Sequence, residues 1–425
     1  MSALGLSLYR TGTGWLRPIA RHVLSERARK GKEDPSRLTE RYGQASLSRP
    51  EGELIWIHAA SVGESLVALT VAERLIEARP QAHVLITSGT LTSASLIARR
   101  NLDQVIHQFP PVDAPQWVGA FLDHWQPDLA VFTESELWPN LICAAKAKAI
   151  PLALINARMN DKSLKSWSRW PETARTVLGA FNWIGAADQR TSDGISALRS
   201  APAPLVGNLK LECGLPDPDP ETLAEARSIV GGRPVFVAAS THAGEEDLIA
   251  QVHRDLLSSH PDALMILAPR HPERASQVGD ALDAAGLTFA QRSLGETPDR
   301  HPVWLADTLG ELGMWYTLCP ATLLAGSLID GIGGHNPVEA TRAGCSVITG
   351  PYVDSFADVF AAYDARQARM IGTTAQELAA HVRRVWSGEG PDLSAAQDAL
   401  ATLSGGALAK TLTALTHLLE QGHTE

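Results

Sequence analysis

The sequence predicts an α/β protein of two doubly wound domains, each with a parallel sheet covered by helices. Three observations support this prediction. The chain has 425 residues, which is too long for one small core and favours two domains. Short apolar runs alternate with helical stretches, a pattern typical of parallel sheets that are buried on both faces. A proline-rich stretch at residues 201–220 interrupts the alternation near the middle of the chain, as expected for a linker.

The first half contains a series of strand-like apolar runs. Each run but the last two is followed by an amphipathic stretch, such as residues 65–80. The runs cover residues 53–60, 82–88, 104–110, 128–134, 151–157 and 182–188. Because parallel strands need a long crossover between them, and a helix is the usual crossover, we expect these runs to form one parallel sheet.

A second series of strand-like runs follows the linker. These runs cover residues 234–240, 263–269, 287–291, 303–307, 321–326 and 345–350. Within the linker, Asp217 and Asp219 have the spacing of a metal-binding Asp-x-Asp pair, but the flanking prolines favour a stiff connector. We therefore divide the chain into an N-terminal segment (1–48), a first domain (49–210) and a second domain (211–425).

The overall composition excludes several classes of protein. Hydrophobic residues make up 44% of the chain and charged residues 20%, which is ordinary for a globular protein. The net charge of −10 argues against a nucleic-acid-binding protein, because such proteins gain affinity by neutralising phosphates. The four cysteines form no Cys-x-x-Cys pair, so neither a zinc site nor a disulfide framework is predicted. A reducing, cytoplasm-facing location fits this composition.

The N-terminal segment differs from the rest of the chain because it is basic and amphipathic. It contains Trp15 and several leucines among many cations. It has no run of 18 uncharged apolar residues, which a membrane span would need, and no signal-peptide cleavage site. One interpretation is a solvated helix that packs on the first domain. We favour attachment to a lipid surface, because a basic amphipathic segment with Trp suits the headgroup boundary.

The loops after the first series of strands carry the first candidate site. Glu64 begins a helix, where the helix dipole stabilises a carboxylate, although it could be only a favourable first-turn acid. Glu134 follows the fourth run. Glu136 lies two residues further on and could simply begin the next helix, and we do not expect the two acids to act as one pair. Lys210 stands beside a Gly-Asn turn and could hold a phosphate or carboxylate, or could simply be solvated.

The loops of the second half suggest a nucleotide pocket. Arg270 at a strand end suits bidentate binding of a phosphate. Gly310 leaves the backbone bare enough to contact a flat ring, and Glu339 could accept hydrogen bonds from two ribose hydroxyls. The stretch GIGGHNPVEA at residues 331–340 could be only a tight turn before a helix, or could let an anionic ligand approach the backbone. Together with Arg270 and Glu339, this stretch favours a ligand site.

Short motifs occur in a characteristic order along nearly the whole chain. They are ASVGES, ESELWPN, NAR, GNLK, STHAGEE, PRHPER, GELG and GGHNPVEA, with LYR and RLTERYG before them. In these motifs the sequence resembles the 3-deoxy-D-manno-octulosonic acid (Kdo) transferase family. The resemblance implies a GT-B fold with two facing Rossmann-like domains. It also implies an inverting transfer of Kdo from CMP-Kdo to the lipid A precursor lipid IVA, in lipopolysaccharide core biosynthesis.

The resemblance also implies a role for particular residues. The first domain would bind the lipid acceptor, with Glu64 as the proton acceptor and with Glu134 and Lys210 as transition-state stabilisers. The second domain would bind the donor. Its implied CMP contacts are Pro269, Arg270, Leu309, Gly310, Glu311, Asn336, Pro337, Val338 and Glu339. No metal or other cofactor is expected. The expected location is the cytoplasmic side of the inner membrane, as a peripheral protein.

Two other functions are compatible with parts of the sequence. A nucleotide-sugar epimerase shares the GT-B architecture, but it would not explain the basic N-terminal segment or Glu64 in the first domain. A non-catalytic protein that binds lipid A is a third possibility, and the combination of acid, base and nucleotide-binding residues argues against it.

Overall fold

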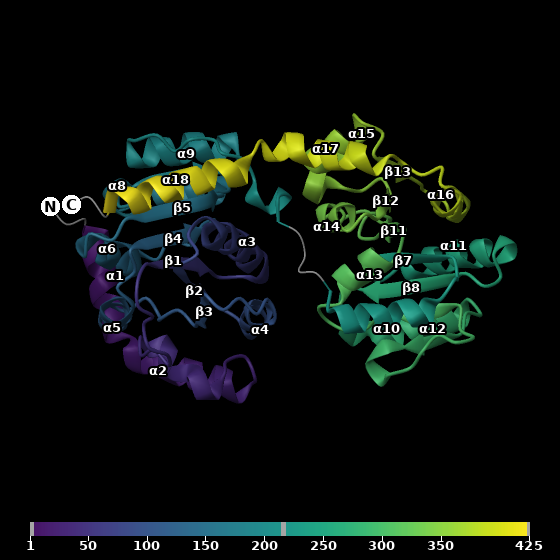
Figure 1. The fold of residues 1–425 in the computed structure, drawn as a ribbon, viewed down its shortest axis with the longest axis horizontal. Helices are drawn as coiled ribbons and strands as arrows, with labels where there is room; N and C mark the ends of the chain where they lie inside the picture. Colours follow the sequence, from purple (N-terminus) through teal and green to yellow (C-terminus); the bar gives the residue numbers. More distant parts are fainter. Residues whose placement is uncertain (1–3, 214–217, 423–425) are drawn as a thin grey trace. The chain divides into compact units, whose positions relative to one another are not determined.

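The computed structural model describes residues 4–213 and 218–422, and the chain divides into two compact units (Figure 1). The first unit consists of Met1–Cys213 and Ser404–Glu425, and the second of Gly214–Leu403. Each unit is an α/β domain with one parallel sheet. The predicted fold class is therefore confirmed.

The sheet of the first unit contains six strands in the described residues, in the order β3-β2-β1-β4-β5-β6. The strands are β1 (Leu54–Ala59), β2 (His83–Ser88), β3 (Val105–Gln108), β4 (Leu129–Thr133), β5 (Leu152–Ala157) and β6 (Trp183–Ala186). All neighbours pair in parallel, and every strand lies within a predicted run. The order reverses between β1 and β4, which is where doubly wound sheets bind ligands.

Alternating residues of β1 bury both faces of this sheet. Leu54 and Trp56 belong to one apolar cluster, and Ile55 and Ile57 belong to the cluster on the other face. The helices that cover the sheet are α3 (Val62–Ala78), α4 (Leu91–Arg99), α5 (Pro115–Trp125), α6 (Pro139–Ala147), α7 (Asp161–Ser168), α8 (Pro171–Gly179) and α9 (Gln189–Arg199). Helices thus follow the last two strands as well, where the sequence pattern indicated none. The short helices α7 and α8 fall below the length at which periodicity is clear.

The N-terminal segment forms two helices, α1 (Leu4–Trp15) and α2 (Arg17–Arg29), and the 3-10 helix η1 (Pro35–Tyr42). The Tyr9 hydroxyl donates to Asp113 Oδ2 at 3.0 Å, and Asn140 Nδ2 donates to Thr13 Oγ1 at 2.9 Å. One face of α1 is therefore fixed to the first unit. Apolar side chains of α1, α2 and the residue between them remain exposed, namely Leu8, Trp15, Leu16, Ile19 and Val23. None of the helices in the described part of the chain combines the length and hydrophobicity of a membrane span.

The sheet of the second unit has seven strands in the described residues, all parallel, in the order β13-β12-β11-β7-β8-β10-β9. The strands are β7 (Val235–Thr241), β8 (Leu264–Pro269), β9 (Phe289–Gln291), β10 (Val303–Leu305), β11 (Ala321–Leu324), β12 (Ser346–Thr349) and β13 (Arg369–Ile371). The first six coincide with predicted runs, and β7 alone among them extends one residue beyond its run, to Thr241. The edge strand β13 was not predicted, because its three residues Arg-Met-Ile are too short and mixed to form a pattern.

Helices again cover both faces of the second sheet. They are α10 (Pro220–Val230), α11 (Glu246–Ser259), α12 (Ala275–Ala284), α13 (Leu312–Leu318), α14 (Val338–Arg342), α15 (Ala357–Asp364), α16 (Ala375–Trp386) and α17 (Leu393–Ser404). In the linker, Asp217 lies outside the described residues. Asp219 is the N-cap of α10 and accepts a hydrogen bond from the Thr222 N–H at 2.8 Å. That contact gives Asp219 a structural role.

The C-terminal residues return to the first unit, which differs from the expected division at residues 211–425. Helix α18 (Ala407–Gly422) packs against α3. Its Leu415 and Leu419 are fully or almost fully buried in the same cluster as Ile55 and Val71. The sequence pattern of α18 shows an amphipathic helix but carries no information about which domain its apolar face covers.

Candidate functional site

Polar residues gather at the carboxyl edge of the first sheet, beside the point where the strand order reverses. Glu64 lies there, in the first turn of α3, which follows β1. Glu134 follows β4, and Asn156 belongs to the end of β5. Lys210 lies in the 3-10 turn η2 (Leu209–Leu211). The structure therefore brings Glu64, Glu134 and Lys210 to one edge of one domain.

Three donors hold the Glu64 carboxylate in a single orientation. Ser61, the N-cap of α3, donates from its hydroxyl to Oε1 at 2.7 Å. Oε2 accepts from the Ala60 N–H at 3.1 Å and from Thr133 Oγ1 at 2.7 Å. The residue keeps 7% of its surface exposed. A carboxylate that is anchored on the protein side and still reachable can accept a proton from a bound ligand.

Lys210 and Glu134 form an ion pair, and Asn156 links both to the edge of the sheet. Asn156 Oδ1 accepts from the Leu209 N–H at 2.9 Å, and its Nδ2 lies 3.4 Å from Glu134 Oε1. The Lys210 side chain is 37% exposed. A Cβ atom added to Gly63 would lie 3.6 Å from Lys210 Nζ, so the start of α3 lies next to this ammonium group. Lys210 thus places its positive charge next to the start of the helix that carries Glu64.

Three strand ends have a left-handed backbone conformation at residues other than glycine. The φ angles are 52° at Glu134, 50° at Asn156 and 59° at Ser240. Such residues cost about 1–3 kcal/mol each and often mark functional sites. Glu134 and Asn156 turn the chain at the same edge of the first sheet that holds Lys210.

Glu136 does not pair with Glu134, because the left-handed backbone at Glu134, with a φ of 52°, breaks the extended conformation in which residues two apart share a side. Its Oε2 accepts from Trp138 Nε1 at 2.7 Å and lies 3.7 Å from His58 Nε2. Burial acts to raise the pKa of the Glu136 carboxyl, but the contacts with His58 and Trp138 outweigh it and the pKa is lowered. Glu136 does not begin the next helix, because α6 starts at Pro139.

The residues of the second unit that were predicted to contact CMP also lie at the carboxyl edge of its sheet. Pro269 ends β8, and the Arg270 N–H donates to the Thr241 carbonyl at 3.0 Å while its side chain is exposed. Residues 309–311 follow β10, the neighbour of β8. Leu309 is 77% exposed, and Gly310 has a φ of 85°. This loop therefore offers a bare backbone, as predicted.

Glu311 is engaged within the protein. Arg292 Nη2 donates to its Oε1 at 3.0 Å, and the Thr308 hydroxyl donates to its Oε2. These contacts occupy both carboxylate oxygens and hold the loop between β10 and α13. A ligand at this loop would meet the backbone of residues 309–311 more readily than the Glu311 side chain.

The glycine-rich stretch connects β11 to the short helix α14. Gly331, Gly333 and Gly334 have φ angles of 92°, 86° and 78°, so the backbone itself requires glycine at these positions. Asn336 Oδ1 accepts from the Val338 N–H at 3.1 Å, and Pro337 is the N-cap. The stretch is a tight turn, and it also carries the predicted polar residues to the sheet edge.

Glu339 lies in the first turn of α14 and is partly buried. Burial raises the pKa of its carboxyl, while a hydrogen bond with Asn336 and the charge of Arg270 act in the opposite direction. The electrostatic influence of Arg270 on Glu339 places the two predicted residues in one neighbourhood. A cation and a carboxylate that share a sheet edge suit a phosphate and a sugar hydroxyl, respectively.

Sequence reasoning missed a histidine pair at the same edge. His242 follows β7 and His335 precedes α14. Their rings stack with centroids 5.0 Å apart, and the two Nε2 atoms lie 2.8 Å apart. Burial, aided by the nearby His242 and Arg270, lowers the pKa of His335 to about 4. Both histidines stand in motifs noted in the sequence, but nothing in their spacing indicated the contact.

A buried carboxylate holds the two loops that carry these histidines. Glu245 is fully buried and accepts from three backbone N–H groups, at 3.0 Å from His242, 2.9 Å from Gly326 and 3.0 Å from Leu328. It therefore connects the loop after β7 to the loop after β11. The available signal in the sequence was an acid just before a predicted helix.

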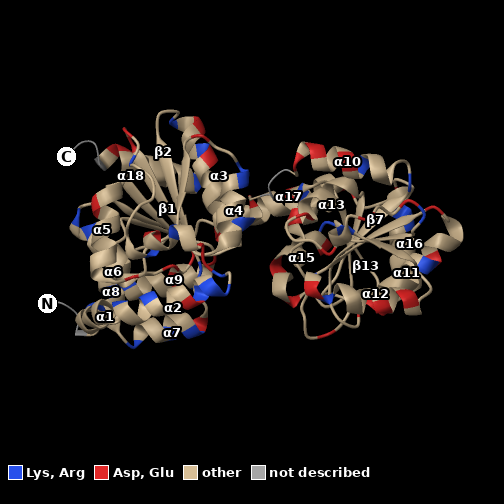
Figure 2. Ribbon diagram, turned by 90° about the horizontal axis from the view of Figure 1, so that it is seen from below, with Lys and Arg blue, Asp and Glu red and all other residues tan. Residues whose placement is uncertain are grey.

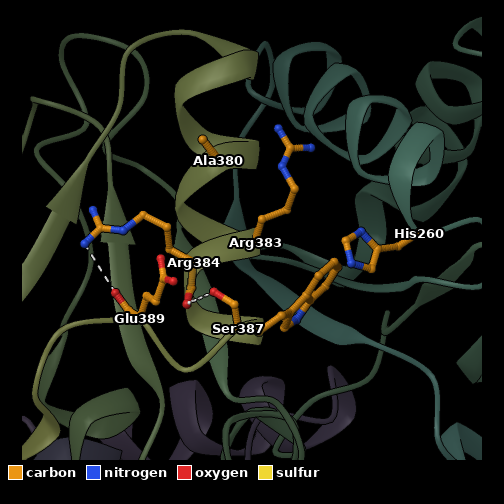
Figure 3. Close-up of a pocket in the computed structure, with 7 residues that line it drawn as sticks. His260, Ala380, Arg383, Arg384, Ser387 and Glu389 are labelled. Atoms are coloured by element: carbon orange, nitrogen blue, oxygen red, sulfur yellow. Dashed lines mark hydrogen bonds between the residues drawn. The ribbon is translucent and has the colours of Figure 1, made fainter.

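A separate pocket of about 470 Å³ lies at the opposite edge of the second sheet (Figure 3). Its lining includes His260, Arg383, Arg384 and Trp386. Trp386 Nε1 donates to the carbonyl of Val235, the first residue of β7, at 2.9 Å. The pocket is thus at the amino ends of the strands, away from the predicted site residues of the second unit. Within residues 4–213 and 218–422, no group of three or more His, Cys, Asp or Glu side chains could hold a metal ion.

Sequence comparisons identify similar proteins. Residues 36–213 match the family described as 3-deoxy-D-manno-octulosonic-acid transferase (kdotransferase). The chain is 37% identical over 378 residues to a probable mitochondrial 3-deoxy-D-manno-octulosonic acid transferase of Arabidopsis thaliana, covering 86% of this chain and 84% of that protein. It is 34% identical over 331 residues to the 3-deoxy-D-manno-octulosonic acid transferase of Haemophilus influenzae, covering 76% and 77%.

Solved structures share the fold at low sequence identity. A glycosyltransferase from Rickettsia africae matches with a TM-score of 0.55 and 12% identity, covering 87% of this chain and 99% of that one. A UDP-GlcNAc 2-epimerase from Neisseria meningitidis also matches with a TM-score of 0.55, at 14% identity, covering 87% and 100%. The fold is therefore common to a transferase and an epimerase and does not distinguish them.

We expect Glu245→Gln to loosen the loops after β7 and β11. The amide would direct N–H groups at backbone donors, and loss of hydrogen bonds to a charged group costs about 1.5–3 kcal/mol. Hydrogen exchange at residues 240–246 and 325–328 of the full chain should accelerate accordingly. Glu225→Gln, on the exposed surface of α10, is the matched control. Unchanged protection in the Glu245 variant would contradict this role.

Proposed function

The chain belongs to the 3-deoxy-D-manno-octulosonic acid (Kdo) transferase family, and we propose that it transfers Kdo from CMP-Kdo to lipid IVA in lipopolysaccharide core biosynthesis. Relatives of that name match this chain at 34–37% identity over three quarters or more of its length. The observation that carries the proposed chemistry is the anchored Glu64 carboxylate, which is not fully buried, at the start of the helix that lies next to the Lys210 ammonium of the Lys210–Glu134 ion pair.

We propose that Glu64 is the general base of an inverting displacement. An acceptor hydroxyl attacks the anomeric carbon of Kdo, and its proton passes to the Glu64 carboxylate. The bond from the anomeric carbon to the CMP phosphate oxygen breaks, and its electron pair leaves with CMP. Ser61, Ala60 and Thr133 hold the carboxylate on its protein side, which supports this role because a base must be oriented before the transition state forms.

Lys210 and Glu134 would stabilise the charges that develop in this displacement. The Lys210 ammonium is a fixed positive charge, and such a charge lowers the barrier most where negative charge appears only in the transition state. Glu134 pairs with the ammonium group, and Asn156 bonds to the turn that carries it. Both contacts restrict the Lys210 side chain, so less conformational entropy is lost when substrates bind.

The donor would lie along the carboxyl edge of the second sheet. Arg270 has an exposed guanidinium for the CMP phosphate, and Asn336 and Glu339 could bind the ribose. Pro269, Leu309, Gly310, Pro337 and Val338 would contribute backbone and apolar contacts. Glu311 would act by holding its loop through Arg292 and Thr308.

A nucleotide-sugar epimerase remains the alternative with the same fold, as the Neisseria meningitidis structure illustrates. Identity of 37% over 86% of the chain favours the transferase. The decisive test is incubation with CMP-Kdo and tetra-acylated lipid A precursor, followed by mass spectrometry. Transfer adds the mass of Kdo to the lipid and releases CMP, whereas an epimerase leaves the lipid unchanged.

We further propose that the protein attaches peripherally to the cytoplasmic side of the inner membrane. Arg17, Arg21, Arg27 and Arg29 lie along α2 (Figure 2), next to the exposed Trp15 and Ile19. Anionic lipids attract each cation near the surface by about 1 kcal/mol, and the apolar side chains can enter the headgroup boundary.

We expect Glu64→Gln to reduce Kdo transfer by about 10²–10⁴-fold, the usual contribution of a general base, because an amide cannot accept the proton. CMP affinity should not change, since the proposed CMP contacts belong to the second domain. Glu77→Gln, exposed on the same helix, should retain wild-type turnover. Retention of more than about a tenth of the activity by Glu64→Gln would remove Glu64 from the role of base.

Arg270→Ala and Glu339→Ala should each weaken CMP binding by about 1–3 kcal/mol, because each removes a hydrogen bond to or from a charged group. Isothermal calorimetry with CMP measures the effect. Arg384→Ala, in the pocket at the opposite sheet edge (Figure 3), is the matched control and should bind CMP normally. Unchanged affinity in both site variants would mean that the nucleotide binds elsewhere.

High salt or alkaline carbonate should release much of the protein from inner-membrane vesicles. Salt screens the attraction between exposed cations and lipid headgroups, and none of the helices in the described residues could hold the protein by spanning the membrane. The released fraction is measured by sedimentation and immunoblotting. Resistance to both washes, with release only by detergent, would show integral attachment.

A further inference from the structure

A second cavity lies in the first unit, between α1, the segment that follows Glu134, and helices α7 and α8. Its volume is about 670 Å³, within the range of about 300–1,000 Å³ that is usual for small-ligand sites. Apolar and aromatic side chains dominate its lining, namely Leu6, Leu8, Leu137, Trp138, Trp167 and Trp170. Three tryptophans from two separate segments thus line the same cavity.

Two polar groups of this lining, those of Glu136 and Tyr9, are directed at protein partners. Glu136 is the charged residue among those that line the cavity, and its carboxylate is bonded to Trp138 and lies near His58. The Tyr9 hydroxyl donates to Asp113. The cavity therefore offers a ligand mostly apolar contacts, which suit a hydrocarbon chain.

The apolar side chains of the lining remain open to solvent. Trp170 is 58% exposed, Leu8 63% and Trp138 38%. Exposed apolar surface gathered in a concave site usually marks a binding site, unlike single exposed residues.

The wall formed by α1 is built into the domain. Tyr9 and Thr13 fix α1 to Asp113 and Asn140. On the opposite side, a Cβ atom on Gly5 would lie 3.0 Å from Thr173 Oγ1 and 3.3 Å from the Trp170 ring. A larger residue at position 5 would therefore crowd the contact between α1 and α8.

The cavity adjoins the proposed catalytic residues. Its lining includes Ser135, the residue directly after Glu134, which pairs with Lys210. A molecule that presents a sugar hydroxyl at Glu64 and carries a hydrocarbon chain could place both parts on this one domain.

We propose that this cavity binds an acyl chain of the glycolipid acceptor. The proposal rests on the proposed function, since it assigns a place to one part of the acceptor. The cavity selects acylated acceptors through the hydrophobic effect. Each methylene of the acyl chain contributes about fourfold in affinity when it is fully buried. The N-terminal helix α1 is then part of the acceptor site as well as of the membrane-facing surface.

The test compares two acceptors in detergent, the tetra-acylated precursor and the corresponding deacylated disaccharide. Wild type should show a kcat/KM at least tenfold higher for the acylated acceptor. The double variant Leu8→Gln, Trp170→Ala should lose about tenfold for the acylated acceptor and nothing for the deacylated one. Retained transfer to the deacylated acceptor, which is proposed to use the same domain, would show that this variant is folded.

A matched control separates the cavity from general lipid attachment. Ile19→Ser and Trp15→Ser alter exposed apolar residues of α1 and α2 that do not line the cavity. They should weaken flotation with anionic vesicles and leave kcat/KM for the detergent-dispersed acylated acceptor unchanged.

Three outcomes would overturn the proposal. The double variant could retain full selectivity for the acylated acceptor, or the control variants could lose as much of it as the double variant. Excess phospholipid chains in detergent could also abolish the selectivity, which would mean that bulk lipid occupies the cavity. Absence of transfer to either acceptor by the wild type would instead reject the proposed function.

Discussion

Burial of the parallel strands on both faces is the constraint on which the rest of the structure depends. Residues of β1 alternate between two apolar clusters, and helices cover both of them. A charged group within such a sheet would lose its hydration without compensation. Charged side chains that must meet a substrate are therefore confined to the edges of the sheet. In both domains the proposed site residues follow the carboxyl ends of strands, as in other doubly wound folds.

In both domains, a carboxylate beside the switch in strand order accepts hydrogen bonds from two neighbouring segments. In the first domain, Glu64 accepts hydrogen bonds from the loop after β1 and from Thr133 of β4. In the second domain, Glu245 joins the loop after β7 to the loop after β11. Both carboxylates lie at the start of a helix. They differ in exposure, since Glu245 is fully buried and Glu64 is not. That difference fits a structural anchor in the case of Glu245 and the proposed proton acceptor in the case of Glu64.

The first domain also combines rigidly placed polar residues with an open apolar surface. Glu134 and Asn156 adopt left-handed conformations that aim their side chains at Lys210 and its turn. The residues that follow Glu134 turn outward and line an aromatic cavity with α1. A soluble substrate would not need this surface. For a lipid acceptor, it allows the polar headgroup and a hydrocarbon chain to be bound by adjacent parts of one domain.

The amino-acid sequence by itself determined the fold class, most of the strands and the strand-end positions of Glu64, Glu134, Arg270 and Glu339. These features depend on local periodicity, and the carboxyl-edge rule converts strand ends into candidate sites. The edge strand β13 was not predicted, because its three residues of mixed polarity are too few to show an alternating pattern. Only the tertiary structure decided that Lys210 pairs with Glu134, that Arg292 engages Glu311, that His242 meets His335, and that α18 returns to the first domain. Each of these contacts joins segments far apart in the chain, and a pattern within one segment carries no information about its partner.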